Sequence, residues 1–424
     1  MAESLVNHVV GDLCLGKPSL RALSLSSTTT VGDALSALKS SQQNFISIWA
    51  CSDESYHTNF PNNYPNINSN NNYENNEGET LGGLNLCTCV GKICMIDIIC
   101  FLCKNENLSS PSAVLSPLSA ILPLDSAKLV KHVDPSTSLL EAIDLIVQGA
   151  QNLVVPIQCP SRTNSRRKQP KRASNNGSTF HNGFEYCWLT LEDVVQFVLG
   201  RIGFFTPIPA LSVETLGIIQ DKVLTVDYHA PASMALDAIA QAMASQTSVG
   251  VVDKDGTLIG EISPLTLCGC DETVVAVIMT LSVGDLMAYI DWGGPPEDII
   301  RVMKARLRDK KLDGSLEMLG DENSSYTSSS SSDDESLLSS PPSTKLTGYT
   351  RSRSYSARMV RKAEALVCHP GSSLVAVMVQ AISHRVNYVL VVEENCTLVG
   401  IVTFRDMLKV FRGHLQTMIE EWDA

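Results

Sequence analysis

HRVNYVLVVEENCTLVGIVTFRDML, residues 384–408, contains two apolar segments, a polar turn between them and the start of a helix. Residues 388–392 are rich in β-branched side chains, which predicts a buried strand. A second strand is predicted over 397–403, where Gly400 indicates that the backbone comes close to another group. A helix then begins with Asp406 in its first turn. A carboxylate there suits the helix dipole and can also bind a vicinal diol through two hydrogen bonds.

This pattern of helix, strand, turn, strand and helix occurs four times along the chain. The predicted helices begin at Val31, Leu139, Met234 and Leu374, and the strands that follow them begin at Phe45, Leu153, Ser248 and Tyr388. The offset between helix and strand is 14 residues in each copy. A constant offset predicts an α/β (α+β) fold of four small units of β-α-β-β-α type.

A single unit of this size cannot bury both faces of its sheet, so the units are expected to pair, one with two and three with four. Their predicted limits are 12–104, 115–201, 208–290 and 362–415. The first two carry an Asn-rich insert at 52–83 and a basic, polar insert at 159–183, which a turn tolerates because loop closure costs little extra. The linker 291–361 contains a predicted helix over 296–307 and Ser-rich acidic and basic runs whose composition predicts disorder.

Composition narrows the class of protein. The chain has 424 residues, of which 44% are hydrophobic, and a net charge of −13, which argues against a nucleic-acid-binding surface. No apolar run is long enough to cross a bilayer and no signal peptide is recognisable, so we expect no membrane association. The 13 cysteines follow no disulfide spacing, which indicates a reducing compartment. We expect a cytoplasmic protein, also nuclear if the basic run at 162–172 acts as an import signal.

The strand, turn and Gly-x-x-Thr-x-x-Asp sequence ending at Asp406 resembles the CBS domain family. With its four units, the chain is similar to plant CBS proteins with two Bateman modules, grouped with the γ subunits of AMP-activated and SNF1-type kinases. The segment DLCLGKP, residues 12–18, adds to that resemblance. The resemblance implies an adenine nucleotide (AMP, ADP or ATP) as regulatory ligand, held between paired repeats. It implies a kinase catalytic subunit or metabolic enzyme as partner, and oligomers formed through Bateman modules. The residues themselves, by cysteine spacing and by the lack of catalytic motifs, predict no metal and no enzyme.

The family also implies roles for individual residues: the aspartate holds the ribose hydroxyls, a preceding Ser or Thr lies at the sugar-phosphate, and basic residues before the strand reach the phosphates. The nucleotide-binding candidates carried over in this way are Asp406, Thr403, Arg385 and His384 in unit four, Thr190 and Asp193 in unit two, and Asp97 in unit one. Unit one has Cys94 in place of the hydroxyl. Unit three has Ser263 but Thr266 in place of the aspartate, so its site is predicted to be weak or empty.

Each of these features also has a purely structural interpretation. The aspartates could stabilise only the helix dipole, and Arg385 could be a solvated loop charge. Cys87, Cys89, Cys94, Cys100 and Cys103 lack the paired spacing of zinc knuckles and are expected to be small buried hydrophobes. Gly11-x4-Gly16-Lys17 imitates a phosphate loop, but Pro18 stands where that loop needs Ser or Thr.

Two functions therefore remain open. The first is a non-catalytic regulatory protein that binds adenine nucleotide and modulates a partner kinase or metabolic enzyme. The second is a ligand-free CBS scaffold that acts as an adaptor through its inserts. No nucleophile elbow or zinc-protease motif is present, and the eight histidines are scattered, so the sequence favours neither hydrolase class.

Overall fold

The structure is a computed structural model, and it describes residues 8–40, 44–51, 87–108, 110–122, 129–157, 181–182, 184–270, 272–292, 297–310, 312 and 363–423. The Asn-rich insert, the Ser-rich runs of the linker and the basic insert up to residue 180 lie outside these residues. Among the residues described, no helix combines the length and the apolar character needed to span a bilayer.

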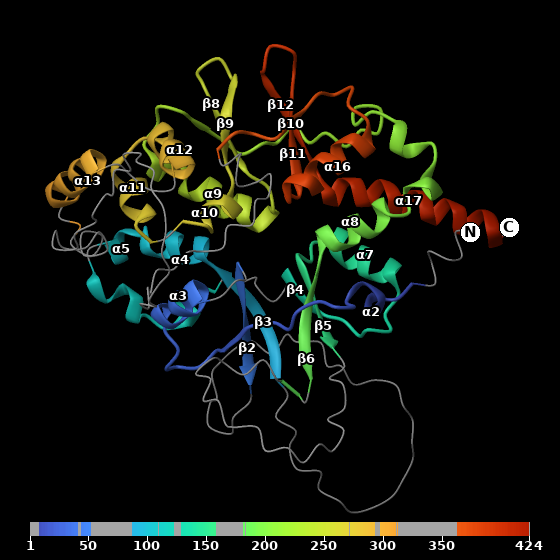
Figure 1. The fold of residues 1–424 in the computed structure, drawn as a ribbon, viewed down its shortest axis with the longest axis horizontal. Coiled ribbons are helices and arrows are strands. Elements are labelled where there is room, and N and C mark those ends of the chain that lie inside the picture. Colours follow the sequence, from blue (N-terminus) through green and yellow to red (C-terminus); the bar gives the residue numbers. More distant parts are fainter. Residues whose placement is uncertain are drawn as a thin grey trace, which may run out of the picture. The chain divides into compact units, whose positions relative to one another are not determined.

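In the part of the chain that the structure describes, twelve strands form four three-stranded sheets with one shared topology (Figure 1). In each sheet the first strand is parallel to the second, and the second is antiparallel to the third. The sheets are β1 (Ala22–Ser24), β2 (Phe45–Cys51) and β3 (Cys87–Cys94); β4 (Val130–His132), β5 (Asn152–Ile157) and β6 (Glu185–Thr190); β7 (Thr225–Asp227), β8 (Val249–Val252) and β9 (Leu258–Ile262); and β10 (Val367–Cys368), β11 (Tyr388–Val392) and β12 (Leu398–Thr403). The predicted α/β repeat is thereby confirmed.

A helix connects the first two strands of each sheet, and another helix follows the third strand. The connecting helices are α3 (Val31–Ser40), α7 (Leu139–Val147), α9 (Leu236–Ser245) and α16 (Leu374–His384), and the closing helices are α4 (Met95–Leu102), α8 (Leu191–Leu199), α10 (Pro264–Leu267) and α17 (Phe404–Asp423). In α7 the buried residues Leu139, Ala142, Ile143 and Ile146 recur at helical spacing, and the Ser138 side chain caps its start by accepting from the Glu141 N–H.

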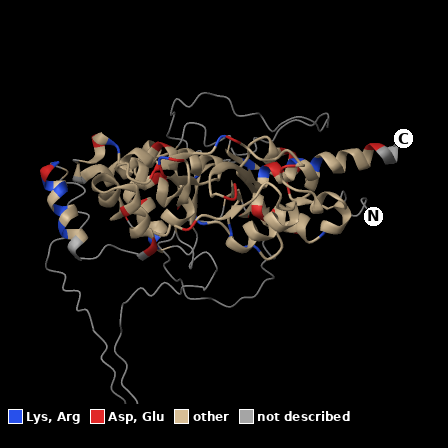
Figure 2. Ribbon diagram, turned by 90° about the horizontal axis from the view of Figure 1, so that it is seen from above, with Lys and Arg blue, Asp and Glu red and all other residues tan. Residues whose placement is uncertain are grey.

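The described residues also contain helices and 3-10 turns outside these two sets. They are α2 (Val10–Leu13), α5 (Asn105–Leu108), α11 (Val274–Thr280), α12 (Val283–Trp292) and α13 (Glu297–Asp309), with 3-10 turns at Pro111–Leu115, Leu118–Ala120, Ile202–Phe205, Ile208–Ala210 and Ala232–Ala235. Helix α13 confirms the helix predicted over 296–307. Basic and acidic residues are interspersed along the described elements (Figure 2).

The strand register corrects one sequence prediction. The residue before each closing helix pairs with Phe45 in the first sheet and with Tyr388 in the fourth, as the constant offset requires. In the second sheet that partner is Asn152, so the predicted equivalence of Leu153 was wrong by one residue. The connection can be shorter there because Gly149 adopts φ +122° just after α7, a conformation that residues with a Cβ avoid.

The chain divides into two compact units. Unit 1 comprises Met1–Ile98, Val114–Thr206 and Arg405–Ala424, and unit 2 comprises Ile99–Ala113 and Pro207–Phe404. Each unit contains two of the four sheets, which agrees with repeats that pair two by two. The outer limits predicted for the repeats stay a prediction.

Within unit 1, an apolar and aromatic cluster joins the first two sheets. Its buried members are Leu20, Ala22, Trp49, Cys89, Val130, Val154 and Tyr186. The later part of α17 also packs in this unit. The ring of Phe411 lies 4.7 Å from that of Phe205, and the Arg412 guanidinium donates two hydrogen bonds to the Asp144 carboxylate, at 2.8 and 3.0 Å.

Within unit 2, the predicted close approach at Gly400 is confirmed. A Cβ atom on Gly400 would lie 2.4 Å from Ile219 Cγ2 and 2.9 Å from the Gln220 carbonyl oxygen. Gln220 and Ile401 exchange two backbone hydrogen bonds of 2.9 Å beside it. Glycine is required here because any side chain would collide with this added backbone segment.

Candidate functional site

The predicted ribose-binding aspartates share one position in the fold. Asp97, Asp193 and Asp406 are each the third residue of a closing helix, and Thr266 has that position in α10. A carboxylate there can accept a hydrogen bond from the backbone N–H of the residue before the helix, which is one half of a capping box. This structural role, which the sequence left open, is present at Asp97 and Asp193, where the contact orients the carboxylate.

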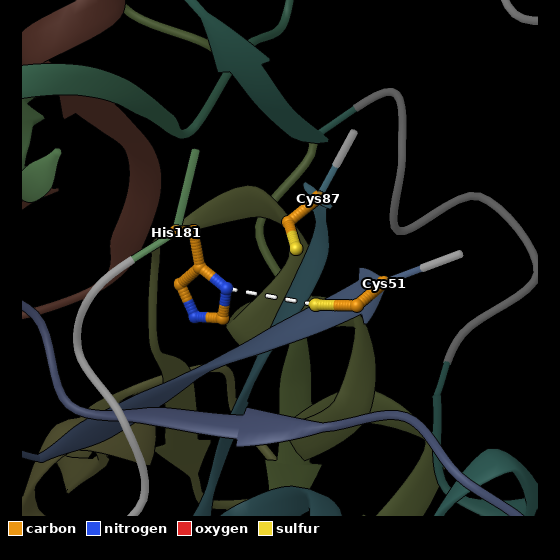
Figure 3. A group of neighbouring side chains, drawn as sticks. All are labelled: Cys51, Cys87 and His181. Carbon is orange, nitrogen blue, oxygen red and sulfur yellow. Dashed lines mark hydrogen bonds between the residues drawn. The ribbon is translucent and has the colours of Figure 1, made fainter. Parts of the chain in front are cut away.

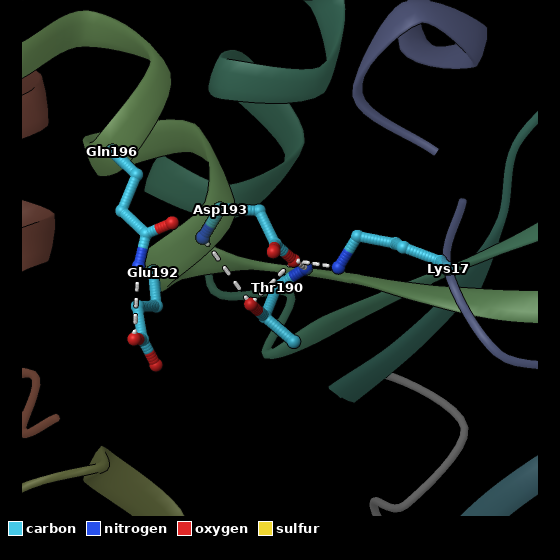
Figure 4. Close-up of polar contacts among 5 residues, drawn as sticks. All are labelled: Lys17, Thr190, Glu192, Asp193 and Gln196. Carbon is cyan, nitrogen blue, oxygen red and sulfur yellow. Dashed lines mark hydrogen bonds and ion pairs between the residues drawn. The ribbon is translucent and has the colours of Figure 1, made fainter. Parts of the chain in front are cut away.

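Asp193 is the centre of the most complete polar cluster at such a position (Figure 4). Its Oδ2 atom accepts from the Thr190 N–H at 2.7 Å and from the Thr190 hydroxyl at 2.6 Å, and the Asp193 N–H donates to Thr190 Oγ1 at 3.3 Å. Lys17 Nζ lies 2.6 Å from the same Oδ2. Both charged side chains are only about one-fifth exposed, at 22% and 23%. The predicted acid and hydroxyl thus come together with a cation.

Lys17 was not among the predicted site residues. It belongs to the DLCLGKP segment, which the sequence marked only as part of the family resemblance. The resemblance places phosphate-binding cations in the loop before each strand, and the loop at 149–152 contains none. The structure brings the cation from the amino-terminal segment instead, a contact that no local spacing could reveal.

Asp97 lies in a less polar setting. Its Oδ2 accepts from the Cys94 N–H at 2.7 Å, and Cys94 supplies no hydroxyl. Burial raises the pKa of the Asp97 carboxyl above its ordinary value, while the Cys94 N–H and the charge of Lys92 act in the opposite direction. Lys92 was also not among the predicted site residues. Its Nζ donates to Asn152 Oδ1 at 2.5 Å, across the seam between the two sheets of unit 1.

The nucleotide-binding candidates of the fourth repeat lie at different positions in the structure. Asp406 and Thr403 are nearly buried, with 6% and 8% of their surface exposed, and Lys409 Nζ donates to Asp406 Oδ1 at 3.0 Å. Arg385 is the exposed cap of α16, in the left-handed conformation at φ 53° and ψ 43°. His384 is the last residue of α16 and lines a hollow in unit 2.

That hollow brings His384 together with the third repeat. Its lining residues are Glu261, Ser263, Thr266, Glu364, Leu366, His384 and Val386. Its cavity volume is about 20 Å³. Since one water molecule needs about 10–15 Å³ by this measure, the hollow has room for water but not for a nucleotide. That the site containing Thr266 is weak or empty stays a prediction.

A buried polar network closes one side of the hollow. The Tyr388 hydroxyl donates to Glu261 Oε1 at 3.1 Å, and the Ser248 hydroxyl donates to Glu261 Oε2 at 2.8 Å. Burial, together with the nearby Glu261 carboxylate, raises the pKa of Tyr388, so the hydroxyl remains a donor. The sequence analysis missed this network. The one sequence feature that could have indicated this network is Tyr388, a tyrosine at the start of an otherwise aliphatic strand.

Comparison with known proteins gives the relationships of the chain. The CBS domain family matches residues 358–413. The chain is 47% identical over 423 residues to the CBS domain-containing protein CBSX5 of Arabidopsis thaliana, covering 98% of this chain and 99% of that protein. It is 22% identical to the Arabidopsis thaliana SNF1-related protein kinase regulatory subunit gamma-like PV42b, over 77% of this chain and 76% of that protein.

Among solved structures, a protein from Methanocaldococcus jannaschii, described as a candidate archaeal homologue of γ-AMPK, aligns with 95% of this chain and 99% of its own. The TM-score is 0.49 and the identity 12%. The relationship that carries weight is the 47% identity along almost the whole of both chains. By that relationship, the chain belongs to the family of CBS domain-containing proteins.

Proposed function

We propose that this chain is a non-catalytic regulatory protein that binds an adenine nucleotide at its paired CBS repeats and thereby changes its affinity for a partner. The observation that carries the proposal is the meeting of Thr190, Asp193 and Lys17 in unit 1, because it combines the three chemical functions that a nucleotide requires. A carboxylate can accept from both ribose hydroxyls, a threonine hydroxyl can donate to the sugar-phosphate, and an ammonium can neutralise a phosphate.

The ion pair also provides a way for ligand to be sensed. The Lys17 ammonium neutralises the Asp193 carboxylate. A nucleotide that bound there would take the carboxylate through its ribose and the ammonium through its phosphate. The amino-terminal segment containing Lys17 would then be released from α8, so the ligand would favour one state over the other by its differential contacts.

Asp406 in unit 1 remains a second proposed position for nucleotide, and Thr403, Arg385 and His384 remain proposed ligand residues of unit 2. Asp406 is less accessible than Asp193, since 9% of its side chain is exposed against 23%. Lys409 supplies a cation there, in the role that Lys17 has beside Asp193. We expect this site to be the weaker of the two, and Asp97, which has no hydroxyl neighbour at Cys94, to be the weakest.

Isothermal titration of AMP, ADP and ATP into the full chain tests the proposal. We expect Asp193→Ala to weaken binding at least tenfold and Lys17→Ala to weaken the phosphorylated ligands more than adenosine. Asp406→Ala should have a smaller effect, and Asp255→Ala, which removes an exposed turn carboxylate, should have none. Absence of heat with the wild type at millimolar ligand would refute the nucleotide-binding function.

A protein kinase catalytic subunit is the partner that the similarity to an SNF1-related regulatory subunit favours. Linkage requires that a nucleotide which changes partner affinity is itself bound differently in the complex. The affinity for a candidate kinase should therefore be measured with and without nucleotide, for the wild type and for Asp193→Ala. A nucleotide effect that persists in the variant would separate partner control from this site.

An adaptor without ligand is the second candidate. The hollow in unit 2 favours it, because about 20 Å³ cannot hold a nucleotide and both Glu261 and Glu364 would repel phosphate. Deleting 52–83, 159–183 or 315–345 distinguishes the two functions. A regulatory nucleotide-binding protein should keep its ligand affinity after each deletion, whereas an adaptor should lose its partner and show no ligand affinity at any stage.

A further inference from the structure

Three side chains with metal-binding atoms converge in unit 1, away from the proposed nucleotide site. They are Cys51, Cys87 and His181, and their ligand atoms all lie within 4.8 Å of one another. Cys51 Sγ is 3.6 Å from His181 Nδ1. Figure 3 shows the imidazole nitrogen directed at the Cys51 sulfur, with the Cys87 sulfur turned toward the same space.

The scaffold holds these side chains in place from two directions. Cys51 and Cys87 are directly opposite each other on the antiparallel strands β2 and β3, so their sulfur atoms are brought together by strand pairing. Asn182 connects the third member to them, because its side-chain oxygen accepts from the Cys87 N–H at 2.7 Å and its side-chain nitrogen donates to the Cys87 carbonyl at 2.8 Å. His181 and Phe184 exchange backbone hydrogen bonds of 2.9 and 3.0 Å.

The orientation of the imidazole is fixed by stacking. The His181 ring lies 4.0 Å from the Trp49 ring at an interplanar angle of 4°. Trp49 is itself almost fully buried and donates from Nε1 to the Ser47 hydroxyl at 2.9 Å. Positions fixed in advance lower the entropy lost when ligands are ordered around an ion, and this is a common property of real metal sites.

From this geometry we propose that Cys51, Cys87 and His181 bind one Zn²⁺ ion, with a fourth position open to water. Two thiolates and an imidazole form a donor set that zinc prefers in tetrahedral coordination. With Zn–S of about 2.3 Å and Zn–N of about 2.0–2.1 Å, tetrahedral geometry separates sulfur and nitrogen by roughly 3.5 Å. The observed 3.6 Å fits that separation. Binding displaces the two thiol protons to solvent.

The three ligands mark the ends of both inserts in the chain. Cys51 immediately precedes residues 52–86, Cys87 follows them, and His181 follows residues 158–180. A bound ion would therefore tie the ends of two long connections to the edge of one sheet. Zinc binding would therefore determine whether the ends of the inserts are held together. The adaptor function would use these inserts, and this effect of zinc does not depend on nucleotide binding.

The sequence analysis expected Cys87 to be a small buried hydrophobe because its neighbours lack a zinc-knuckle spacing. That reasoning holds for Cys89, Cys94 and Cys103, which are buried. Cys87 is half-buried, and the ligand partners proposed for it are distant in the sequence, so their spacing is visible only after the strands pair.

Metal titration of the full chain tests the proposal. Protein purified under anaerobic, reducing conditions and stripped with chelator should take up one Zn²⁺ per chain in competition with a chromophoric chelator. Co²⁺ in place of zinc should give thiolate charge-transfer bands and the intense visible bands of tetrahedral coordination. Cys51→Ser, Cys87→Ser and His181→Gln should each weaken zinc at least about tenfold and reduce those bands.

Two matched variants control for the other cysteines and histidines. Cys396→Ser and His229→Gln change exposed residues in unit 2 and should leave zinc affinity unchanged. Circular dichroism checks that each ligand variant keeps its secondary structure, and Cys51→His, which retains a ligand, should recover part of the affinity. The proposal is overturned if the wild type takes up no stoichiometric zinc, if the ligand variants bind as the controls do, or if peptide mapping finds Cys51 and Cys87 joined as a disulfide in the anaerobic protein.

Discussion

Unit 1 and unit 2 have different side chains at the same pair of positions in their repeats. The first position is on the third strand of a sheet, three residues before its closing helix. It is Lys92 on β3 in unit 1 and Glu261 on β9 in unit 2. The second position is on the middle strand of the other sheet in the unit, paired with the residue just before α8 or α17. It is Asn152 in unit 1 and Tyr388 in unit 2. The two pairs make equivalent contacts across the seam, at 2.5 and 3.1 Å.

The difference teaches how one repeat architecture can prefer different ligands. In unit 1 the seam carries an ammonium, and a second ammonium, that of Lys17, lies beside Asp193. In unit 2 it carries a buried carboxylate satisfied by two hydroxyls, and Glu364 adds a second acid to the hollow. Phosphate is attracted to the first arrangement and repelled by the second, so the fold alone does not predict where a nucleotide binds.

The largest expected effect concerns packing between strands. Gly400 lies on β12 of unit 2, four residues before α17. The equivalent position on β6 of unit 1, four residues before α8, is the buried Cys187. Gly400→Val would push side-chain atoms into Ile219 and the Gln220 carbonyl. We expect it to lower the free energy of unfolding by about 3 kcal/mol or more, measured by denaturant titration with calorimetry.

Gly413→Val is the matched control, because a Cβ there meets nothing within 4 Å and the residue lies on the exposed side of α17. It should change the free energy of unfolding by no more than about 0.5 kcal/mol. Equal losses for both glycine variants would mean that the added segment at 219–220 can move aside.

The second effect concerns the buried carboxylate of unit 2. Tyr388→Phe removes a hydrogen-bond donor to the buried Glu261 carboxylate, so we expect a loss of about 1.5–3 kcal/mol in the free energy of unfolding. Tyr289→Phe removes a hydroxyl contact of 2.9 Å to neutral Thr273 and should cost about half as much. In the Glu261→Gln background the cost of Tyr388→Phe should shrink, and an unchanged cost would show that the carboxylate charge is irrelevant.

These features differ in how far sequence could predict them. The helix and strand periods identify all four repeats, and Gly400 was predicted because a glycine inside a strand indicates close approach. Leu153 was assigned one residue too far because the offset alone cannot show where Gly149 shortens a connection. Such errors remain local because the strands still pair.

The polar contacts of the sites were mostly beyond prediction. Lys17 meets Asp193, Glu261 meets Tyr388, and Cys51 meets His181 across long stretches of chain. Capping carboxylates follow from short spacing, so Asp193 and Asp97 could be found. The cation beside Asp193 could not, because a tertiary contact brings Lys17 to it.

The smallest expected effect is a pH dependence within unit 1. Burial raises the pKa of Asp97, so the folded state favours its protonated form. The stability that this carboxyl contributes is therefore fully present below its unfolded pKa of about 3.9 and is lost as the pH rises through the folded value. Asp97→Asn keeps an acceptor for the Cys94 N–H without the buried charge. We expect it to gain up to about 1 kcal/mol at pH 7 and to flatten this decline.

Asp134 supplies the opposite sign in the same unit. Hydrogen bonds from the Ser136 hydroxyl and N–H lower its pKa, so its contribution is present at neutral pH and disappears as the pH falls through the folded value. Asp134→Asn should therefore reduce stability at pH 7 and have no effect in acid. Thermal unfolding of both variants between pH 3 and 8 measures the two slopes. If Asp97→Asn destabilised the chain at neutral pH, the attraction of Lys92 would outweigh the burial of the carboxylate, and the cationic seam of unit 1 would be the stronger influence.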